Sequence, residues 1–310
     1  MLNATMARTY RTMESTMSDF TGVYPAIITP MTAAGDLSEE AFRVVYEGNV
    51  RAGAHGFWVA GGTGESVYLT EAENNRIAEM AADQNGGRVK NIMHVGAATT
   101  TQAARQAEHA AKAGVEAICA VPPFFYGVED EAIVEYYRVV GSAADLPLFA
   151  YNLPHATGVD IVPELMAKIQ DKVPQLRGLK HSSTEFHNVA AYVEMGLDCF
   201  IGSSLLMVPA LAVGAVGCID GPLCIVPELW VDIWNAHRAG DGEAALAAQR
   251  RATEFVTLSR TIPFPAGFKT LCEARFEIEC GDPRPPFPPA SEEQKMGLIA
   301  TARSQGWLDL

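Results

Sequence analysis

Residues 92–121 read IMHVGAATTTQAARQAEHAAKAGVEAICAV and contain two apolar runs with a helical segment between them. The runs are Ile92–Gly96 and Ala117–Val121. The alanine-rich segment 101–113 ends before Gly114, and glycine is typical of the position that follows a helix. Short, nearly continuous apolar runs are typical of strands that a parallel sheet buries on both faces. This stretch therefore predicts a strand, a helix and a second, parallel strand.

The same pattern recurs from residue 22 to residue 219. Eight apolar runs alternate with longer segments that carry helix signals, among them a capping box at Thr70 and Glu73 and a helix that opens at Pro163. The runs are Val23–Ile28, Gly56–Ala60, Ile92–Gly96, Ala117–Val121, Pro147–Tyr151, Arg177–Lys180, Cys199–Gly202 and Val216–Ile219. Eight such units predict an α/β fold, a (β/α)₈ TIM barrel.

A doubly wound open sheet is the alternative fold. That fold favours a glycine-rich turn after the first strand, and Thr29-Pro30-Met31-Thr32 offers none. We expect residues 21–225 to form the barrel and residues 226–310 to form a C-terminal helical extension. Helices are expected there over 227–239, 243–261, 266–275 and 291–305. Residues 1–20 lack the apolar core of a secretory signal, and we expect them to be disordered.

Composition excludes several classes of function. The 310 residues carry a net charge of −14, which argues against nucleic acids and anionic membranes as partners. The longest apolar stretch, Leu205–Ile219, has 15 residues and is too short to span a bilayer. The six cysteines include no CxxC and the seven histidines no HExxH, so we expect neither a disulfide framework nor a bound metal. Free buried thiols are typical of a reducing compartment, so the predicted location is cytoplasmic.

Three strand ends carry residues that suit chemistry, and barrel enzymes place their active residues there. The loop GGTGES at 61–66 can present backbone N–H groups to a carboxylate. Tyr151 can relay a proton through its phenol. Burial at Lys180 favours a neutral amine that can attack a ketone. Each of these three features also has a purely structural interpretation. The loop can be an ordinary glycine-rich turn, Tyr151 can pack at the mouth of the barrel, and Lys180 can extend its amine to water.

Together these residues resemble the dihydrodipicolinate synthase/N-acetylneuraminate lyase family of class I, Schiff-base pyruvate aldolases. The resemblance covers residues 22 to about 305. The matching motifs are Gly22-Val23-Tyr24-Pro25 with Thr29-Pro30, GGTGES at 61–66, VPPFFYG at 121–127, YNLPHATG at 151–158, GLKHSS at 178–183, Gly202 and the segment 214–217.

The resemblance implies a role for each matching residue. Lys180 corresponds to the Schiff-base lysine and Tyr151 to the tyrosine that shuttles protons. Thr63 and the backbone of Gly62 correspond to the loop that holds the 2-oxo acid carboxylate. The remaining substrate-binding positions implied are Ile219, Gly202, Ser203, Phe125 and His155. Glu65 fits a structural acid better than a catalyst. Because the imine is itself the electron sink, no cofactor or metal is implied. The implied partners are pyruvate and an aldehyde, and the implied assembly is a homodimer or homotetramer.

Departures from the family pattern bear on the substrate. Dihydrodipicolinate synthases carry a threonine at position 62, a second tyrosine at position 125 and an arginine at position 156, where this chain has Gly62, Phe125 and Ala156. Whether Tyr126 replaces the second tyrosine stays open. Losing an arginine that clamps a carboxylate is not a conservative change, which disfavours that synthase activity.

Three other branches of the family can be compared with this chain at the same motifs. Ser203 and Ser204 follow Gly202 where sialic acid lyases have acidic residues, which argues against a full N-acetylneuraminate specificity. The GGTGE loop is similar to that of keto-deoxy-glucarate dehydratases. The alanine at position 156 resembles the residue found there in aldolases that act on 2-keto-3-deoxy sugar acids.

The predicted function is a Schiff-base lyase that joins or separates pyruvate and an aldehyde. Its predicted substrate is a 2-keto-3-deoxy sugar acid or an N-acetylneuraminate-like acid. The alternatives are a 5-keto-4-deoxyglucarate dehydratase-like enzyme, a 4-hydroxy-tetrahydrodipicolinate synthase and a non-catalytic relative that binds a keto acid.

Overall fold

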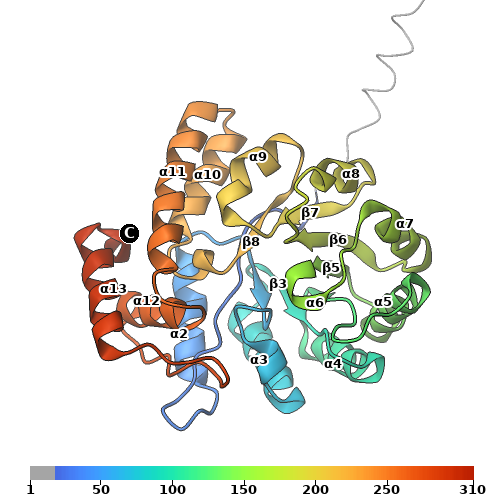
Figure 1. Ribbon diagram of the computed structural model, residues 1–310, viewed down its shortest axis with the longest axis horizontal. Coiled ribbons are helices and arrows are strands. Elements are labelled where there is room, and N and C mark those ends of the chain that lie inside the picture. Colours follow the sequence, from blue (N-terminus) through green and yellow to red (C-terminus); the bar gives the residue numbers. More distant parts are fainter. Residues whose placement is uncertain (1–17) are drawn as a thin grey trace, which may run out of the picture.

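The computed structural model describes residues 18–310. Eight parallel strands form a nearly closed barrel with helices around it, in the order β1-β8-β7-β6-β5-β4-β3-β2 (Figure 1). The strands are β1 (Gly22–Pro25), β2 (Gly56–Val59), β3 (Lys90–His94), β4 (Ala117–Ala120), β5 (Leu148–Asn152), β6 (Leu176–His181), β7 (Asp198–Ile201) and β8 (Gly217–Asp220). A bridge between Ala26 and Trp58 joins the β1 and β2 sides. The predicted (β/α)₈ barrel is confirmed.

Apolar side chains fill the inside of the barrel. Alternate residues of each strand point inward, so Tyr24 of β1 lies beside Ile219 of β8, and Lys180 of β6 beside Phe200 of β7. The inward residues form one buried cluster, and the outward residues form a second cluster with the helices. Both faces of each strand are therefore buried, which explains why the strands appear in the sequence as continuous apolar runs.

Each strand is followed by a helix of the outer layer. These helices are α2 (Glu39–Arg51), α3 (Glu71–Asn85), α4 (Thr100–Ala113), α5 (Asp130–Ala144), α7 (Pro163–Lys172), α8 (Asn188–Glu194), α9 (Met207–Ala212) and α10 (Glu228–Arg238). Thr70 caps α3 in a complete capping box with Glu73, Gly114 ends α4 with a φ of +92°, and Pro163 is the first residue of α7. The local signals predicted these three boundaries because they depend on neighbouring residues alone.

Shorter helical turns lie in the connections near the strand ends. They are α6 (Pro154–Thr157), η1 (Ser66–Tyr68), η2 (Ser204–Leu206) and η3 (Pro222–Cys224), and η4 (Trp307–Asp309) lies close to the C-terminus.

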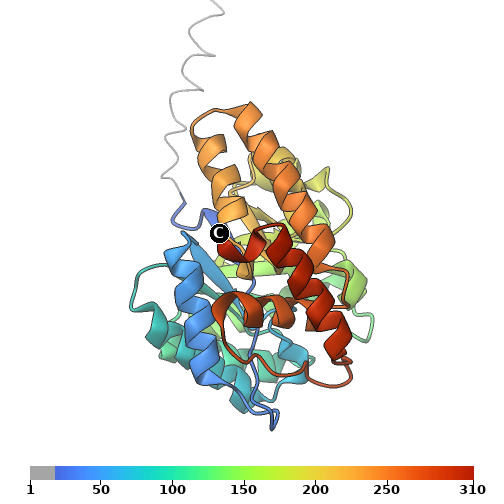
Figure 2. The same cartoon turned by 90° about the vertical axis from the view of Figure 1, so that its left-hand side faces the viewer.

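The C-terminal helices pack on one side of the barrel (Figure 2). The extension contains α11 (Gly242–Ser259), α12 (Ala266–Phe276) and α13 (Glu292–Ser304), close to the predicted ranges. Helix α10, which the sequence assigned to the extension, packs against β1 and takes the eighth helix position of the barrel. Helix α11 lies along α10, and α12 contacts α2. The extension therefore reaches from the eighth unit of the barrel back to the first.

The N-terminal prediction can be compared with the structure only in part. Residues 1–17 of the segment expected to be disordered lie outside the described residues. Phe20 is buried inside the barrel, where its ring packs edge-on against Phe149 with centroids 5.2 Å apart. Ser18 donates a hydrogen bond to Asp198 at the start of β7. Residues 18–20 thus cover the end of the barrel opposite the carboxyl ends of the strands.

All six cysteines are buried, and none of them forms a disulfide bond. None of the helices within residues 18–310 combines the length and apolar character that crossing a bilayer requires.

Candidate active site

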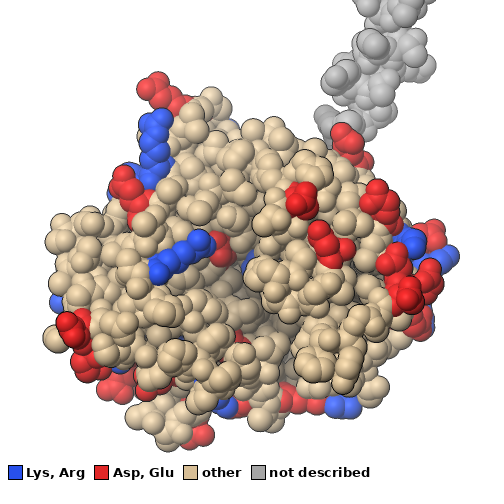
Figure 3. Space-filling view, viewed as in Figure 1, with Lys and Arg blue, Asp and Glu red and all other residues tan. Residues whose placement is uncertain are grey.

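A cavity of about 800 Å³ opens at the carboxyl ends of the strands. In Figure 3 a hollow lies near the middle of the face that Figure 1 presents, within a surface that is mostly free of charged side chains. Seven of the predicted site residues line this cavity, namely Gly62, Thr63, Tyr151, His155, Lys180, Gly202 and Ser203. The fold therefore brings together residues from the ends of β2, β5, β6 and β7.

Lys180 lies at the floor of the cavity, with 4 % of its surface exposed. It pairs in register with Tyr151 of β5 on one side and Phe200 of β7 on the other. Its Nζ lies 4.5 Å from the centroid of the Tyr151 ring and 5.2 Å from that of Trp58. None of the ion pairs among residues 18–310 includes Lys180. The amine is therefore surrounded by aromatic rings and has no carboxylate bound to it, so its nitrogen is available to a ligand.

Tyr151 stands between Lys180 and the glycine-rich loop. Its ring packs edge-on against Trp58, with centroids 5.3 Å apart and planes at 83°. A Cβ added at Gly62 would lie 4.0 Å from the Tyr151 hydroxyl oxygen. The phenol therefore faces the loop, within reach of any ligand that lies between the loop and Lys180.

The loop at 61–66 is a tight turn held by its surroundings. The Gly62 carbonyl accepts a hydrogen bond from the Glu65 N–H at 3.0 Å, and the Gly64 carbonyl accepts one from the Thr29 hydroxyl at 2.8 Å. A Cβ at Gly64 would come within 2.9 Å of the Ala60 Cα, so only glycine fits there. The loop thus holds Gly62 and Thr63 in a fixed position at the cavity wall.

Glu65 ties the same loop to the C-terminal extension. Its Oε1 lies 3.0 Å from Lys269 Nζ, and both side chains are almost fully buried. Its Oε2 accepts the Arg284 N–H at 2.6 Å. Glu65 itself has a φ of +61°, a conformation that a non-glycine residue adopts only when its surroundings hold it. These contacts fit the structural role that the sequence indicates for this acid.

Gly202 makes room for a neighbouring hydroxyl. A Cβ at Gly202 would collide with Ser182 Oγ, which is buried and has no hydrogen-bond partner within the described residues. Ser182, Ser203 and Asp220 follow or end β6, β7 and β8, and all three line the cavity. This side of the cavity therefore offers hydroxyl and carboxylate oxygens to a polar ligand.

Two predicted residues lie outside the cavity. Ile219 is fully buried inside the barrel beside Tyr24, and the role implied for its backbone stays a prediction. Phe125 is 84 % exposed and has a φ of +82°, and its ring packs edge-on against Tyr126, which is 76 % exposed. Neither aromatic residue lines the cavity of its own chain. The substrate contact implied for Phe125 therefore stays a prediction.

The cavity also contains His94, which ends β3 and is not among the predicted site residues. Its Nε2 accepts the Val121 N–H at 3.4 Å, so the ring proton lies on Nδ1, 3.3 Å from Ser66 Oγ. Burial, reinforced by the nearby charge of Lys180, lowers the pKa of His94 from 6.5 to about 4. His94 is therefore neutral at physiological pH and supports the glycine-rich loop through Ser66.

Asp220 and Arg260 line the cavity as well, and neither was predicted. Asp220 ends β8, so the rule that active residues lie at strand ends could have identified both Asp220 and His94. Arg260 follows α11 in the extension, where that rule gives no signal.

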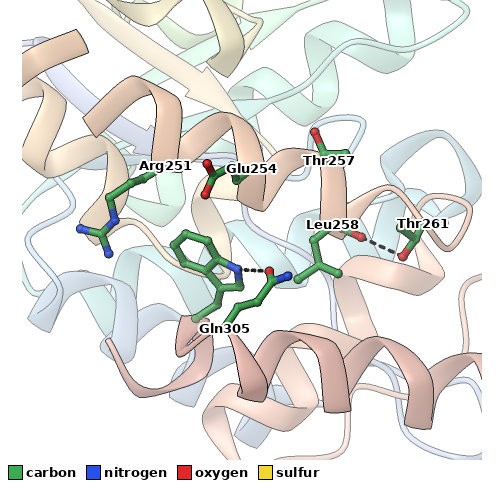
Figure 4. A pocket seen from close by; sticks show the side chains of 7 residues that line it. Arg251, Glu254, Thr257, Leu258, Thr261 and Gln305 are labelled. Carbon is green, nitrogen blue, oxygen red and sulfur yellow. Dashed lines mark hydrogen bonds between the residues drawn. The ribbon is translucent and has the colours of Figure 1, made fainter. Parts of the chain in front are cut away.

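A second hollow of about 750 Å³ lies between α11 and the C-terminal residues (Figure 4). Trp307 lines it and donates a hydrogen bond to Gln305 at 2.7 Å, and Thr261 donates one to the Leu258 carbonyl. It contains no residue from a strand end. Within residues 18–310 no group of three or more histidine, cysteine or acidic side chains is placed to hold a metal.

Comparison with known proteins supports the family suggested by the motifs. Residues 19–305 match the Dihydrodipicolinate synthetase family. The 4-hydroxy-tetrahydrodipicolinate synthase of Methanopyrus kandleri is 33 % identical over 297 residues, which cover 93 % of this chain and 97 % of that protein.

Solved structures share the fold over nearly the whole chain. CdNal from Clostridium difficile in complex with mannosamine has a TM-score of 0.87 at 25 % identity, covering 93 % of this chain and 99 % of that one. YagE from E. coli K12 in complex with pyruvate has a TM-score of 0.88 at 23 % identity, with the same coverage.

Proposed function

Because the chain belongs to the dihydrodipicolinate synthetase family, we propose that it is a lyase that forms a Schiff base between Lys180 and pyruvate. The family consists of lyases that use a lysine–pyruvate imine without a metal. One observation carries the proposal. Among residues 18–310, Lys180 is the only lysine that lines the cavity, and its buried amine lies 4.5 Å from the ring of Tyr151 in a cavity that also includes the Gly62–Thr63 loop.

The reaction follows from these positions. The carboxylate of a 2-oxo acid binds the N–H groups and hydroxyl of residues 62–63, which places its C2 carbonyl near Lys180. The amine adds to C2 and water leaves, forming an iminium. Tyr151 takes the proton of the C4 hydroxyl as the C3–C4 bond breaks, and the electron pair moves into an enamine. An aldehyde leaves, C3 is protonated, and hydrolysis of the imine releases pyruvate and free Lys180.

The proposed substrate is a 2-keto-3-deoxy sugar acid or an N-acetylneuraminate-like acid. Such a molecule carries several hydroxyl groups beyond C3, and burying them requires hydrogen-bond partners. Ser182, Ser203 and Asp220 supply these partners on one wall of the cavity. Ala156 lines the cavity where the synthases of this family have an arginine, which disfavours 4-hydroxy-tetrahydrodipicolinate synthesis.

Dehydration is the second candidate reaction, and the similarity of the GGTGE loop to that of keto-deoxy-glucarate dehydratases favours it. A threonine at 62 would place its side chain beside the Tyr151 hydroxyl, so glycine removes a proton-relay partner from that phenol. Tyr151 must then exchange its proton with the substrate. In a dehydratase the same iminium loses a proton from C3, and the C4 hydroxyl leaves as water after protonation by Tyr151.

A panel of 2-keto-3-deoxy acids separates these reactions. Release of pyruvate, measured with a coupled dehydrogenase, supports the aldolase, whereas a dioxo acid without pyruvate supports the dehydratase. Condensation of pyruvate with aspartate semialdehyde would instead support the synthase. Lys180→Ala should abolish turnover, and Lys112→Ala, at an exposed site on α4, should retain it. Full turnover by Lys180→Ala would contradict the proposal, and binding of keto acids without turnover or an imine would indicate a non-catalytic relative.

A further inference from the structure

Trp58 lies beside the reacting amine and has no part in the proposed reaction. It is the third residue of β2, it is fully buried, and it points into the barrel. Lys180 Nζ lies over its ring, 5.2 Å from the centroid, and over the ring of Tyr151 at 4.5 Å. A Cβ added at Gly61 would come within 2.6 Å of the indole, so glycine at that position makes room for it. The indole is therefore held against both the amine and the first residue of the glycine-rich loop.

The iminium of the proposed reaction is a cation that forms in a buried position. A buried charge is costly unless a partner compensates it. No carboxylate of residues 18–310 forms an ion pair with Lys180. Asp220, an acid of the cavity wall, accepts the N–H groups of Gly221 at 2.8 Å and Ser204 at 2.9 Å instead. The compensation for the iminium therefore has to come from groups other than a paired carboxylate.

The two aromatic rings can supply this compensation. The face of an aromatic ring is electron-rich and attracts a cation that lies within about 6 Å of the centroid, and the indole of tryptophan attracts it most strongly. The nitrogen of the imine is the lysine Nζ itself, so it stays close to the two rings after condensation. The rings attract the protonated iminium more strongly than the neutral imine. They therefore favour the form that carries the proton.

Resting on the proposed function, we propose that Trp58 keeps the imine protonated by holding the face of its indole against the iminium cation. The protonated form is the better electron sink. When the C3–C4 bond breaks, its electron pair forms the C2–C3 double bond, and the pair of the C=N bond moves onto nitrogen, which becomes neutral. Tyr151 makes a similar contact, but its phenol also moves protons. Trp58 exchanges no proton with the substrate, so its effect is electrostatic.

Most groups that face the amine from the neighbouring strands stay uncharged between about pH 6 and pH 10. Burial, with the charge of the nearby lysine as a smaller cause, lowers the pKa of His94 on β3 to about 4. Burial also raises the pKa of the Cys119 thiol on β4, the Cys218 thiol on β8 and the Tyr24 phenol on β1 well above their ordinary values. A change of charge on the imine itself is therefore the main event on the inner side of the site.

Further titratable groups line the cavity, and a test of Trp58 has to leave them unaltered. They are Glu65, Tyr68, Tyr151, His155, Asp220 and Arg260. Fluorine atoms on tryptophan change none of these side chains and keep the shape of the indole nearly constant. They withdraw electrons from the ring, so each added fluorine weakens the attraction between its face and a cation.

Fluorinated tryptophan therefore tests the inference. The full-length chain is produced with ordinary, monofluorinated, difluorinated or trifluorinated tryptophan, and the rate at which cyanoborohydride traps saturating pyruvate is measured against pH. This reagent reduces the iminium, so the trapping rate falls at the pH where the imine loses its proton. We expect that pH to decrease with each added fluorine, by roughly 0.5 to 1.5 units in total.

The other three tryptophans provide a matched control. Trp230, Trp234 and Trp307 lie on α10 and η4, outside the cluster that fills the barrel, and they carry the same fluorine atoms. In Trp58→Phe, fluorination should therefore leave the pH dependence unchanged. Tyr151→Phe should show the same shift as the wild type, because it has no phenol to titrate. A pH dependence that ignores fluorination, or that shifts only when the Tyr151 phenol is present, would overturn the inference.

Failure of this inference differs from failure of the proposed function. If pyruvate is trapped on Lys180 but fluorination leaves the pH dependence unchanged, the imine forms and only the role of Trp58 is wrong. If the wild type with ordinary tryptophan traps no pyruvate, then no imine forms, and the Schiff-base proposal and the role of Trp58 are both wrong.

Discussion

Tyr151 and Lys180 are the two residues on which the chemistry depends, and they have different tasks. Adjacent parallel strands place them side by side, so their relative position follows from the register of β5 and β6. Lys180 holds the substrate covalently, whereas Tyr151 moves protons after the imine has formed. The two steps can therefore be separated by mutation.

Tyr151→Phe should keep the imine and lose turnover. The substitution removes only the hydroxyl and leaves the ring that packs against Trp58. We expect kcat to fall by about 10²- to 10⁴-fold, the usual contribution of a positioned acid–base group. Borohydride should still trap pyruvate on Lys180 in this variant. Tyr46→Phe, which removes a hydroxyl that bonds Asn91 outside the cavity, is the matched control. Unchanged kcat in Tyr151→Phe would contradict the assignment.

His94 should make the protein less stable in mild acid. The unfolded chain takes up the histidine proton near pH 6.5, whereas the folded chain does so only near pH 4. The free energy of unfolding is therefore highest above pH 6.5 and falls as the pH decreases to 4, by about 3 kcal/mol for this residue. Urea unfolding at several pH values should show a shallower decrease for His94→Gln than for the wild type. The exposed His237→Gln should follow the wild type, and equal slopes for all three would contradict the prediction.

At the scale of elements, the extension helps to build the cavity. Lys269 of α12 and the Arg284 N–H both bind Glu65, and so hold the loop that carries Gly62 and Thr63. The sequence indicated that Glu65 is structural, but it could not reveal a partner 204 residues away (269 − 65). Such a contact depends on how the last helices return to the first strands.

Lys269→Met should weaken both stability and substrate binding. Removing one partner leaves a buried charge on Glu65, at a cost of about 3–5 kcal/mol. The loosened loop should raise KM for the 2-oxo acid. The double variant Glu65→Gln/Lys269→Met should recover part of both losses, because it leaves no unpaired charge. Lys168→Met removes an exposed pair with Asp130 and should cost at most about 1 kcal/mol without changing KM. Unchanged KM in Lys269→Met would show that the ion pair does not position the loop.

At the scale of the whole molecule, the sequence predicted the barrel well because each strand leaves a local signal. Runs such as Ala117–Val121 are apolar throughout since both faces of the strand are buried, and caps such as Thr70 mark where helices begin. The cavity could be predicted only where its residues lie at strand ends. Arg260 and Lys269 reach the site from the extension, and their approach depends on packing between distant segments.

The exposed pair Phe125 and Tyr126 indicates self-association. Two large aromatic side chains at 84 % and 76 % exposure are unusual on a free surface and typical of an interface. We expect a homodimer or homotetramer that buries them. Sedimentation velocity should show a smaller species for Phe125→Ser/Tyr126→Ser than for the wild type, whereas Met296→Ser on α13 should have no effect. If the double variant sediments as the wild type does, these residues are not the contact.

Condensation of Lys180 with pyruvate would leave an imine that borohydride reduces to a stable amine. The full-length chain is incubated with pyruvate and borohydride, digested and analysed by mass spectrometry. We expect the peptide containing Lys180 to gain the mass of one reduced pyruvyl group, and the Lys180→Ala variant to gain none. An unmodified Lys180 at saturating pyruvate, or a modification on another lysine, would contradict it.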